Sequence, residues 1–416
     1  MKIYVEVFGC TANKADASLI KGQIKKGNHE IVNNPKDADA LIILTCTVID
    51  TTEQRMLFRI KQLNTTGKKL IVAGCMASIQ REKIQDINSN IMFLPAQDSH
   101  QILNLLDNEK TEDKQGNKTK YTKYFDDVLA PISIAEGCNF NCSYCITTKA
   151  RGNLRSFPIS EIKEDIKGAI SQGCKEIQLT AQDTSSYGLD SNNNLGVLLQ
   201  SLNDINEEIR IRIGMMNPYT FLKNQESIIK GYKDSKIYKF AHLPVQSGDN
   251  KILSNMNRRY TVEEFKKAVK IFRENYPEIT IATDIIVGFP TETDEQFQHT
   301  IDLLKDIKPD ITNITRFSAR PFTKAKTMKG RIKTEKVKER SKILSELCSK
   351  ISKENNIKHI GKKYNVLITE KGKNNTFVGR SGNYKPVVIN EAVCIGRFYS
   401  VKIEKAASTF LVGSII

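Results

Sequence analysis

The feature that most constrains the fold is a repeated alternation of short apolar runs with helical patterns between residues 129 and 320. Six runs have the length and composition of strands, and stretches with apolar residues at helical spacing lie between them. Strands that alternate with helices form parallel sheets, so the chain is of the α/β class. Six such units predict a partial (βα)6 barrel of the TIM type, which remains open. The predicted strands are PISIAEG, EIQLTAQ, IRIRIG, KFAHLPVQ, ITIATDIIVGF and DITNITRF.

The flanking sequence predicts one further domain on each side of this barrel. Residues 1–106 contain the apolar runs IYVEVFG, DALIILTC and KLIVAGC, which predict a small parallel-sheet α/β domain. Residues 107–128 are polar and predict a linker. The barrel domain covers residues 129–355 and ends in a basic amphipathic helix that begins near residue 333. Residues 356–416 alternate as five short strands and predict a small all-β barrel of OB-like size.

Three cysteines, Cys138, Cys142 and Cys145, lie in the loop after the first predicted barrel strand. Barrels of this type place their active sites at the carboxyl ends of the strands. One interpretation is a zinc ion completed by a distant ligand, for which the five histidines offer few partners. The other is a [4Fe–4S] cluster, in which three thiolates leave one iron without a protein ligand. An open coordination position is typical of a catalytic metal site.

Three further cysteines, Cys10, Cys46 and Cys75, each follow a predicted strand of the N-terminal domain. The carboxyl ends of parallel strands meet at one edge of a sheet, where open α/β sheets bind ligands. A single cysteine at such a position is usually a small buried hydrophobic residue. Three in equivalent positions predict a second site with three thiolates.

The composition indicates a cytoplasmic protein. No apolar run approaches the ~18 residues that cross a bilayer, and the first residues enter a predicted strand without a secretory signal. In a reducing compartment, nine cysteines favour metal binding or catalysis over disulfides. We expect no membrane contact, and a monomer as the default. The remaining cysteines are expected to be structural: Cys174, Cys348 and Cys394.

The positive charge is concentrated in the last quarter of the chain. Of the net charge of +16, residues 321–416 contribute +14, from 21 lysines and arginines against 7 glutamates. This distribution indicates a polyanion-binding surface, although a solvated lysine-rich surface is the alternative. Aromatic side chains of the predicted barrel can stack on unpaired bases or pack its core. These are Tyr364, Phe377, Tyr384, Phe398 and Tyr399.

The C-x3-C-x2-C loop after the first strand of a (βα)6 barrel resembles the radical S-adenosylmethionine (SAM) superfamily. The resemblance implies that Cys138, Cys142 and Cys145 bind a [4Fe–4S] cluster whose open iron is chelated by SAM. Reductive cleavage of SAM would then give methionine and a 5′-deoxyadenosyl radical that abstracts hydrogen.

The segments FGCTANKADA, LTCTVIDTTEQR and VAGCMAS resemble the cysteine segments of the methylthiotransferase family, and the resemblance covers nearly the whole chain. It implies an auxiliary [4Fe–4S] cluster on Cys10, Cys46 and Cys75, a radical SAM barrel, and a C-terminal TRAM barrel. One SAM would methylate a sulfur held by the auxiliary cluster, and a second would supply the radical. The implied partners are an external electron donor of the ferredoxin or flavodoxin kind and a sulfur donor.

Polar residues near the expected barrel mouth are candidates for cofactor or substrate binding. Gln182 and Asp183, in TAQDTSSYG, suit hydrogen bonds to the ammonium or ribose of SAM. Arg151 and Arg155, in KARGNLRS, can clamp a carboxylate of SAM or of the substrate. A salt bridge that fixes the loop is the alternative for either arginine.

Two later segments, HLPVQSGD and TDIIVGFPTET, also match the family and lie at predicted strand ends. They make Gln246 and Asp284 candidates for contacts with cofactor or substrate. His242 begins the first segment, where it can equally be a core histidine with its hydrogen bonds satisfied.

The segments GCTANKADA, TCTVIDTTEQRM and KARGNLRS are most similar to the threonylcarbamoyladenosine branch of the family, particularly its archaeal and eukaryotic members. The resemblance implies conversion of N6-threonylcarbamoyladenosine beside the tRNA anticodon, at position 37, to its 2-methylthio derivative. The alternatives are methylthiotransferases for isopentenyladenosine in tRNA or for an aspartate of a ribosomal protein. A hypothesis of another class is a non-catalytic RNA-binding iron–sulfur protein.

Overall fold

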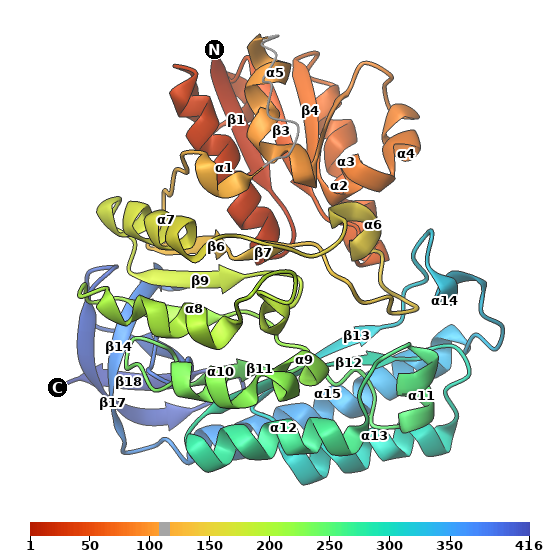
Figure 1. Ribbon diagram of the computed structural model, residues 1–416, viewed down its shortest axis with the longest axis vertical. Coiled ribbons are helices and arrows are strands. Elements are labelled where there is room, and N and C mark those ends of the chain that lie inside the picture. The colour runs from red at the N-terminus through yellow and green to blue at the C-terminus, as the bar shows by residue number, and fades with distance from the viewer. Residues whose placement is uncertain (108–116) are drawn as a thin grey trace. The chain divides into compact units, whose positions relative to one another are not determined.

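The structure, a computed structural model, describes residues 1–107 and 117–416 (Figure 1). Residues 108–116 of the predicted linker lie outside the described residues. The chain divides into two compact units that are each built from several segments. The first unit contains Met1–Gln172, Thr180–Gln182 and Ser318–Lys326, and the second contains Gly173–Leu179, Asp183–Phe317 and Thr327–Ile416.

A five-stranded parallel sheet with the order β2-β1-β3-β4-β5 forms the N-terminal part of the first unit. The expected strands are present as β1 (Lys2–Val7), β3 (Ala40–Thr45) and β4 (Lys69–Gly74). The short edge strands β2 (Glu30–Val32) and β5 (Met92–Pro95) were not expected, because neither contains a long apolar run. The helices are α1 (Thr11–Lys26), α2 (Asp50–Asn64), α3 (Cys75–Ile79), α4 (Arg81–Gln85) and α5 (Ile102–Asp107).

The core of this sheet consists of two apolar layers, one on each face. Successive strand residues point to opposite faces. Ile42 of β3 therefore packs with Ile20 of α1 on one face, and the next residue, Ile43, packs with Met56 of α2 on the other. Because both faces are covered, β3 is apolar almost throughout.

The first unit continues with β6 (Leu129–Ser133), the first of the six predicted barrel strands. A short antiparallel pair follows, formed by β7 (Ala135–Glu136) and β8 (Arg155–Ser156). The segment between these two strands contains the second group of cysteines and the helix α6 (Thr147–Arg151). Helix α7 (Ile159–Ser171) comes next in the chain.

The second unit contains the other five predicted barrel strands, so all six are present. Strands β9 (Glu176–Thr180) and β10 (Arg210–Ile213) pair in parallel. Strands β11 (Phe240–His242), β12 (Thr280–Val287) and β13 (Ile311–Arg316) form a parallel sheet in that order. The helices are α8 (Leu195–Ser201), α9 (Pro218–Lys223), α10 (Gln225–Gly231), α11 (Asn250–Asn255), α12 (Val262–Asn275), α13 (Asp294–Ile307) and α15 (Thr334–Ile357). Helix α14 (Lys324–Thr327) lies in the first unit except for its last residue.

A closed five-stranded barrel ends the second unit, as the alternation in the sequence predicted (Figure 1). Its strands are β14 (Lys363–Lys371), β15 (Phe377–Arg380), β16 (Pro386–Ile389), β17 (Phe398–Ala406) and β18 (Leu411–Ile415), and its order is β14-β15-β16-β18-β17. Three of the aromatic side chains considered for base stacking pack against its core. They are Tyr364, Phe377 and Tyr399.

Among the described residues, no helix has both the length and the hydropathy to cross a lipid bilayer.

Candidate functional site

Cys10, Cys46 and Cys75 follow three neighbouring parallel strands of the first unit, β1, β3 and β4. Cys10 precedes α1 and is exposed, Cys46 is half-buried, and Cys75 is the first residue of α3 and is buried. Adjacent strands lie about 4.8 Å apart, so the three strand ends converge as the sequence predicted.

Two glycines allow this convergence. Gly9 comes so close to the second strand end that a Cβ atom there would lie 2.9 Å from the Cβ of Cys46. Gly74, with φ +86°, would place a Cβ 2.7 Å from the carbonyl oxygen of Thr45. A side chain at either position would push the cysteine-bearing loops apart.

The three thiols influence one another electrostatically. The pKa of Cys75 is raised to about 11, mainly by burial and also by the neighbouring Cys10 and Cys46, against the lowering effect of Arg151. Burial and Cys10 also raise the pKa of Cys46. Three converging thiolates are unfavourable without added positive charge, which a thiophilic metal cluster supplies. The donor set therefore fits an iron–sulfur cluster.

The loop with Cys138, Cys142 and Cys145 is closed by backbone hydrogen bonds, and all three cysteines are half-buried. The amide of Cys138 donates to the carbonyl of Gly152 at 3.1 Å, and the amide of Cys145 donates to the carbonyl of Cys142 at 3.1 Å. Gly137 (φ +81°) has no room for a Cβ, which would lie 1.9 Å from the carbonyl oxygen of Asn153.

Backbone amides also point at two of these sulfurs. The amide of Phe140 donates to Sγ of Cys138, and that of Thr147 to Sγ of Cys145, both at 3.4 Å. Such bonds favour the thiolate and tune the potential of a bound cluster. Among the described residues, no three His, Cys, Asp or Glu side chains form a site for a single metal ion. A cubane cluster holds its cysteine sulfurs farther apart than a single metal ion does. The fit of a [4Fe–4S] cluster to this loop is therefore judged by the type of donor atom and by the amide–sulfur hydrogen bonds, and both favour the cluster.

Arg151 lies in a buried network of charges that joins the two cysteine-bearing segments of the chain, and it is only 3% exposed. One guanidinium nitrogen donates to Asp16 at 2.7 Å and to Asn13 at 2.8 Å, and the other donates to Glu136 at 3.0 Å. Lys118 donates to the same two carboxylates at 2.7 Å. Burial alone would raise the pKa of Asp16, but Arg151 and Lys118 hold it below its ordinary value.

This network corrects the prediction that Arg151 clamps a ligand carboxylate. The Arg151 guanidinium forms its hydrogen bonds with residues of the chain itself. The alternative interpretation, a salt bridge that fixes the loop, is therefore the correct one for Arg151. Arg155 remains 44% exposed at its side chain, and its guanidinium lies 3.9 Å from Glu136. Of the two arginines, only Arg155 keeps a surface for a ligand.

Gln182 and Asp183 have structural partners. The side-chain oxygen of Gln182 accepts from the amide of Gly137 at 2.6 Å, and so supports the cysteine loop. Asp183 is 3% exposed, and its carboxylate accepts five hydrogen bonds from the chain. A carboxylate has about four acceptor positions, so the predicted bond from Asp183 to SAM is not supported. The donors are the amides of Ser185 and Asn217 and the hydroxyls of Ser185, Ser186 and Thr220.

Gln246 and Asp284 meet in the sheet β11-β12-β13. Gln246 has a left-handed backbone (φ +74°), and its amide donates to the carbonyl of Asp284 at 2.8 Å. The Asp284 carboxylate lies 2.9 Å from Nε2 of His242 and accepts from Asn313 at 2.8 Å. Burial would raise the pKa of Asp284, but the bond from His242 and that from Asn313 hold it lower. His242 and Asp284 thus form a polar pair on the neighbouring strands β11 and β12.

The segment from Ser318 to Lys326 was not singled out in the sequence, yet it contacts both cysteine regions. Arg320 is buried, pairs with Glu53, and lies 3.3 Å from the hydroxyl of Thr47, the residue after Cys46. In the sequence, Arg320 and Glu53 are two charged residues without a pattern around them, and only the structure shows that both are buried. Pairing between residues 267 positions apart is not visible in a sequence pattern.

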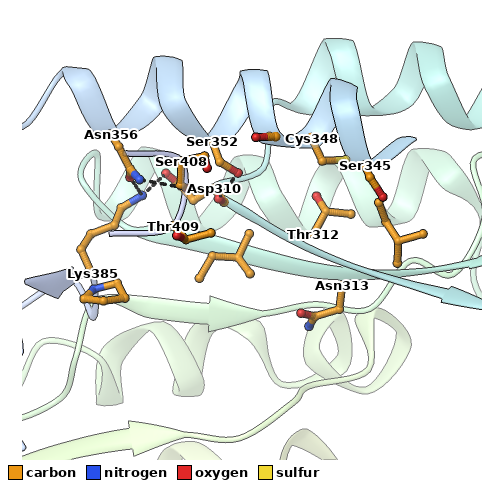
Figure 2. A pocket seen from close by; sticks show the side chains of 14 residues that line it. Asp310, Thr312, Asn313, Ser345, Cys348, Ser352, Asn356, Lys385, Ser408 and Thr409 are labelled. Atoms are coloured by element: carbon orange, nitrogen blue, oxygen red, sulfur yellow. Dashed lines mark hydrogen bonds and ion pairs between the residues drawn. The ribbon is translucent and has the colours of Figure 1, made fainter. Parts of the chain in front are cut away.

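A pocket of about 480 Å³ lies within the second unit, where α15, β13 and the small barrel meet (Figure 2). At one end, the Lys385 ammonium donates to Asp310 at 2.6 Å and to Asn356 at 3.0 Å. The remainder is lined by a mixture of apolar side chains, such as Ile311 and Pro386, and hydroxyl-bearing ones, such as Thr312 and Ser345. The buried lysine joins the barrel to the strand and helix beside it, and we read this end of the pocket as structural.

Comparison with known proteins places all three parts of the chain in families. The Radical SAM superfamily matches residues 132–304, the uncharacterized protein family UPF0004 matches residues 2–94, and the TRAM domain matches residues 358–416. A solved radical SAM methyltransferase, TsrM from Kitasatospora setae, has a TM-score of 0.58 over 78% of this chain and 75% of its own. Its 12% identity supports the fold alone.

Curated relatives match the full chain. The protein named probable threonylcarbamoyladenosine tRNA methylthiotransferase of Pyrococcus horikoshii is 41% identical over 430 residues, covering 100% of both chains. The protein named tRNA-2-methylthio-N(6)-dimethylallyladenosine synthase of Thermodesulfovibrio yellowstonii is 34% identical, covering 100% of this chain and 98% of its own. The superfamily match implies SAM and a [4Fe–4S] cluster. The chain therefore belongs to the radical SAM methylthiotransferases, in the branch of the threonylcarbamoyladenosine tRNA methylthiotransferases.

Proposed function

We propose that this enzyme converts N6-threonylcarbamoyladenosine at position 37 of tRNA to its 2-methylthio derivative. The observation that carries the proposal is the 41% identity, over the full chain, to a relative named for this substrate. The sequence similarity in the segments GCTANKADA and KARGNLRS supports the same branch.

The cysteines divide between two clusters in this proposal. Cys138, Cys142 and Cys145 would hold the [4Fe–4S] cluster that binds SAM, and Cys10, Cys46 and Cys75 would hold an auxiliary one. When bound, the first cluster would supply the electron for cleavage of SAM, and the second would hold the sulfur that is methylated and transferred. The chain itself holds the cysteine loop through Gln182 and ties both cysteine regions to one buried network through Arg151.

Substrate binding is assigned to exposed basic groups. The threonyl carboxylate of the substrate base would pair with Arg155, which has an exposed side chain in the segment that follows the cysteine loop. Gln246 and Asp284 remain candidates for contacts with SAM or the base. Lys363 and Lys402 are exposed and directly opposite one another on β14 and β17. Like charges in this position destabilise a sheet, and an RNA phosphate would offset that cost.

The remaining partners follow from the chemistry. The enzyme needs an external electron donor of the ferredoxin or flavodoxin kind and a source of sulfur, and we propose that it acts as a monomer in the cytoplasm. These parts of the proposal are supported by the family and by the cysteine content.

The test is nucleoside mass spectrometry of tRNA from cells with and without the gene. We expect the 2-methylthio derivative of threonylcarbamoyladenosine to disappear with the gene and to return on complementation. Complementation with a Cys138→Ala variant should fail. An unchanged pool of this nucleoside in the deletion strain would contradict the proposal.

A second candidate substrate, dimethylallyladenosine in tRNA, is favoured by the 34% identity to a protein named for it. Purified enzyme given tRNA with either modification separates the two. We expect methylthiolation of the threonylcarbamoyl form, and the opposite preference would assign the chain to the other substrate.

A further inference from the structure

Phe322 is an exposed aromatic residue with an unusual backbone conformation. It is 68% exposed, and its φ of +60° lies in the left-handed region that bulky residues rarely adopt. A conformation of this kind persists only where the surroundings impose it, and such positions concentrate at ligand-binding sites. An exposed phenyl ring contributes little to the core, and a ring held in this backbone conformation is available to an external partner.

The loop that carries Phe322 is fixed on both sides. Before it, Arg320 is buried and lies 3.3 Å from the hydroxyl of Thr47. After it, the amide of Ala325 donates to the carbonyl of Ser143 at 2.8 Å. Phe322 therefore protrudes from a rigid support.

These anchors place the loop beside both cysteine regions. Thr47 follows Cys46 directly, and Ser143 follows Cys142 directly. A group that rests on the Phe322 loop is therefore held near the positions where the proposed clusters bind.

The segments on either side of Phe322 bring exposed apolar and basic side chains, together with one exposed carboxylate, that of Asp50. Thr47 and Asp50, which contact the loop, flank the exposed side chains of Val48 (51%) and Ile49 (36%). On the other side, α14 begins at Lys324, and its lysines are exposed. Aromatic rings beside lysines are the combination with which proteins bind single-stranded nucleic acid, because each base has a flat face and each phosphate a negative charge.

We propose that Phe322 is a stacking platform for an unpaired RNA base next to the adenosine that is modified. The ring would stack on this base, and the lysines of α14 would contact the adjoining phosphates. The platform would hold the anticodon loop in the position where the target base reaches the reaction site. This inference rests on the proposed function, because it requires an RNA substrate.

The chain contains no tryptophan, which allows a direct test. A Phe322→Trp variant has a single tryptophan at the proposed platform, and a Phe58→Trp variant has one at a matched exposed position on α2 (63% exposed) of the same unit. The probe is a synthetic anticodon stem-loop that carries threonylcarbamoyladenosine. We expect the RNA to quench emission from position 322, since stacked bases quench indole, and to leave emission from position 58 unchanged.

Affinity gives the second measurement. Phe322→Ala should weaken binding of the same RNA by about tenfold, and Phe322→Trp should bind like the wild type, since one stacked base contributes on this scale. Phe58→Ala should have no effect. The iron content and melting temperature of each variant report whether it folds.

The outcomes separate this inference from the proposed function. In one outcome the wild type binds and modifies the RNA, but the RNA does not change the emission from position 322, and Phe322→Ala binds the RNA as tightly as the wild type. The stacking platform is then wrong and the proposed function stands. In that case the exposed ring serves another partner, such as a protein. If the wild type neither binds nor modifies this RNA, both proposals fail.

Discussion

At the scale of single residues, Arg151 has the most consequential position in the first unit. It follows the cysteine loop in sequence but forms its bonds with Asp16, on the helix that begins after Cys10, and with Glu136. Its guanidinium also contributes to the electrostatic environment of Cys75. One buried cation therefore fixes the geometry of both cysteine regions.

Substitution of Arg151 tests this role. Arg151→Met would leave the buried Asp16 with Lys118 as its remaining cationic partner, and Glu136 with Lys118 and the more distant Arg155, so we expect a loss of about 3–5 kcal/mol in the free energy of unfolding. Arg155→Met, at the exposed arginine, should cost less than about 1 kcal/mol. Urea unfolding of the apoprotein measures both. Equal and small effects would contradict the structural role of Arg151.

The sequence pattern could single out the six cysteines as candidate ligands but could not decide between binding and structural roles for polar residues. The position of a cysteine after a strand is a local property, and in the structure Cys10, Cys46 and Cys75 do follow β1, β3 and β4, while Cys138, Cys142 and Cys145 lie between β7 and β8. Arg151 bonds to Asp16, which is far away in the sequence, and Asp183 accepts bonds from the tight turn that follows it. The spacing of apolar residues in the sequence does not indicate bonds of either kind. The burial of Arg151 and Asp183, at 3% each, is a consequence of tertiary packing.

At the scale of elements, the small barrel is joined to β13 and α15 by a buried ion pair. Lys385 is 3% exposed and pairs with Asp310.

Regular strands and helices were largely predictable, because apolar runs and helical spacing are repeated over many residues. The short strands β2 and β5 were not, because three or four residues carry too little pattern.

The buried pair can be compared with an exposed one. Lys385→Met would leave Asp310 without its cation, and we expect a loss of about 3 kcal/mol in unfolding free energy. Lys362→Met, which breaks the exposed pair with Glu278, is the matched control and should cost less than about 1 kcal/mol. Both are measured by urea unfolding followed by circular dichroism. Similar costs for the two variants would contradict the assignment of Lys385 as the anchor.

His359, between α15 and β14, makes stability depend on pH. Burial, together with Lys385 and Lys362, lowers the pKa of His359 to about 4, and its Nδ1 lies 2.5 Å from the hydroxyl of Tyr364. The unfolded chain therefore binds this proton more readily than the folded one, and stability is lost as pH falls from about 6.5 towards 4.

The expected loss between pH 7 and pH 5 is on the order of 1–2 kcal/mol from this group. His359→Gln, which cannot be protonated, should unfold with a smaller pH dependence over the same range. Thermal unfolding at each pH measures the difference. If the melting temperatures of the wild type and of His359→Gln fall in parallel as the pH is lowered, His359 is not responsible for the pH dependence of stability.

At the scale of the whole molecule, the charge is distributed as an RNA-binding enzyme requires. The last 96 residues carry +14 of the net +16, and most of this charge belongs to the basic helix and the small barrel. The sequence alone predicted this asymmetry, and it predicted the order of the three parts, since composition changes along the chain. Which exposed lysines contact phosphate depends on the folded surface.

Lys363 and Lys402 are the predicted phosphate contacts. In Lys363→Ala/Lys402→Ala, RNA affinity should fall at low salt, and the slope of log K against log salt should become shallower by about 1 to 2. Replacement of Lys267 and Lys270, exposed lysines of α12, should leave the slope unchanged. A double variant of the barrel with the wild-type slope would show that this face does not bind RNA.

The central claim is that each group of three cysteines holds its own [4Fe–4S] cluster. Iron and acid-labile sulfide are measured after anaerobic reconstitution of the wild type and of two triple alanine variants, one for each group. The account predicts that each variant retains about half of the wild-type iron. Full iron in the variant lacking Cys10, Cys46 and Cys75, or zinc in place of iron in the wild type, would contradict it.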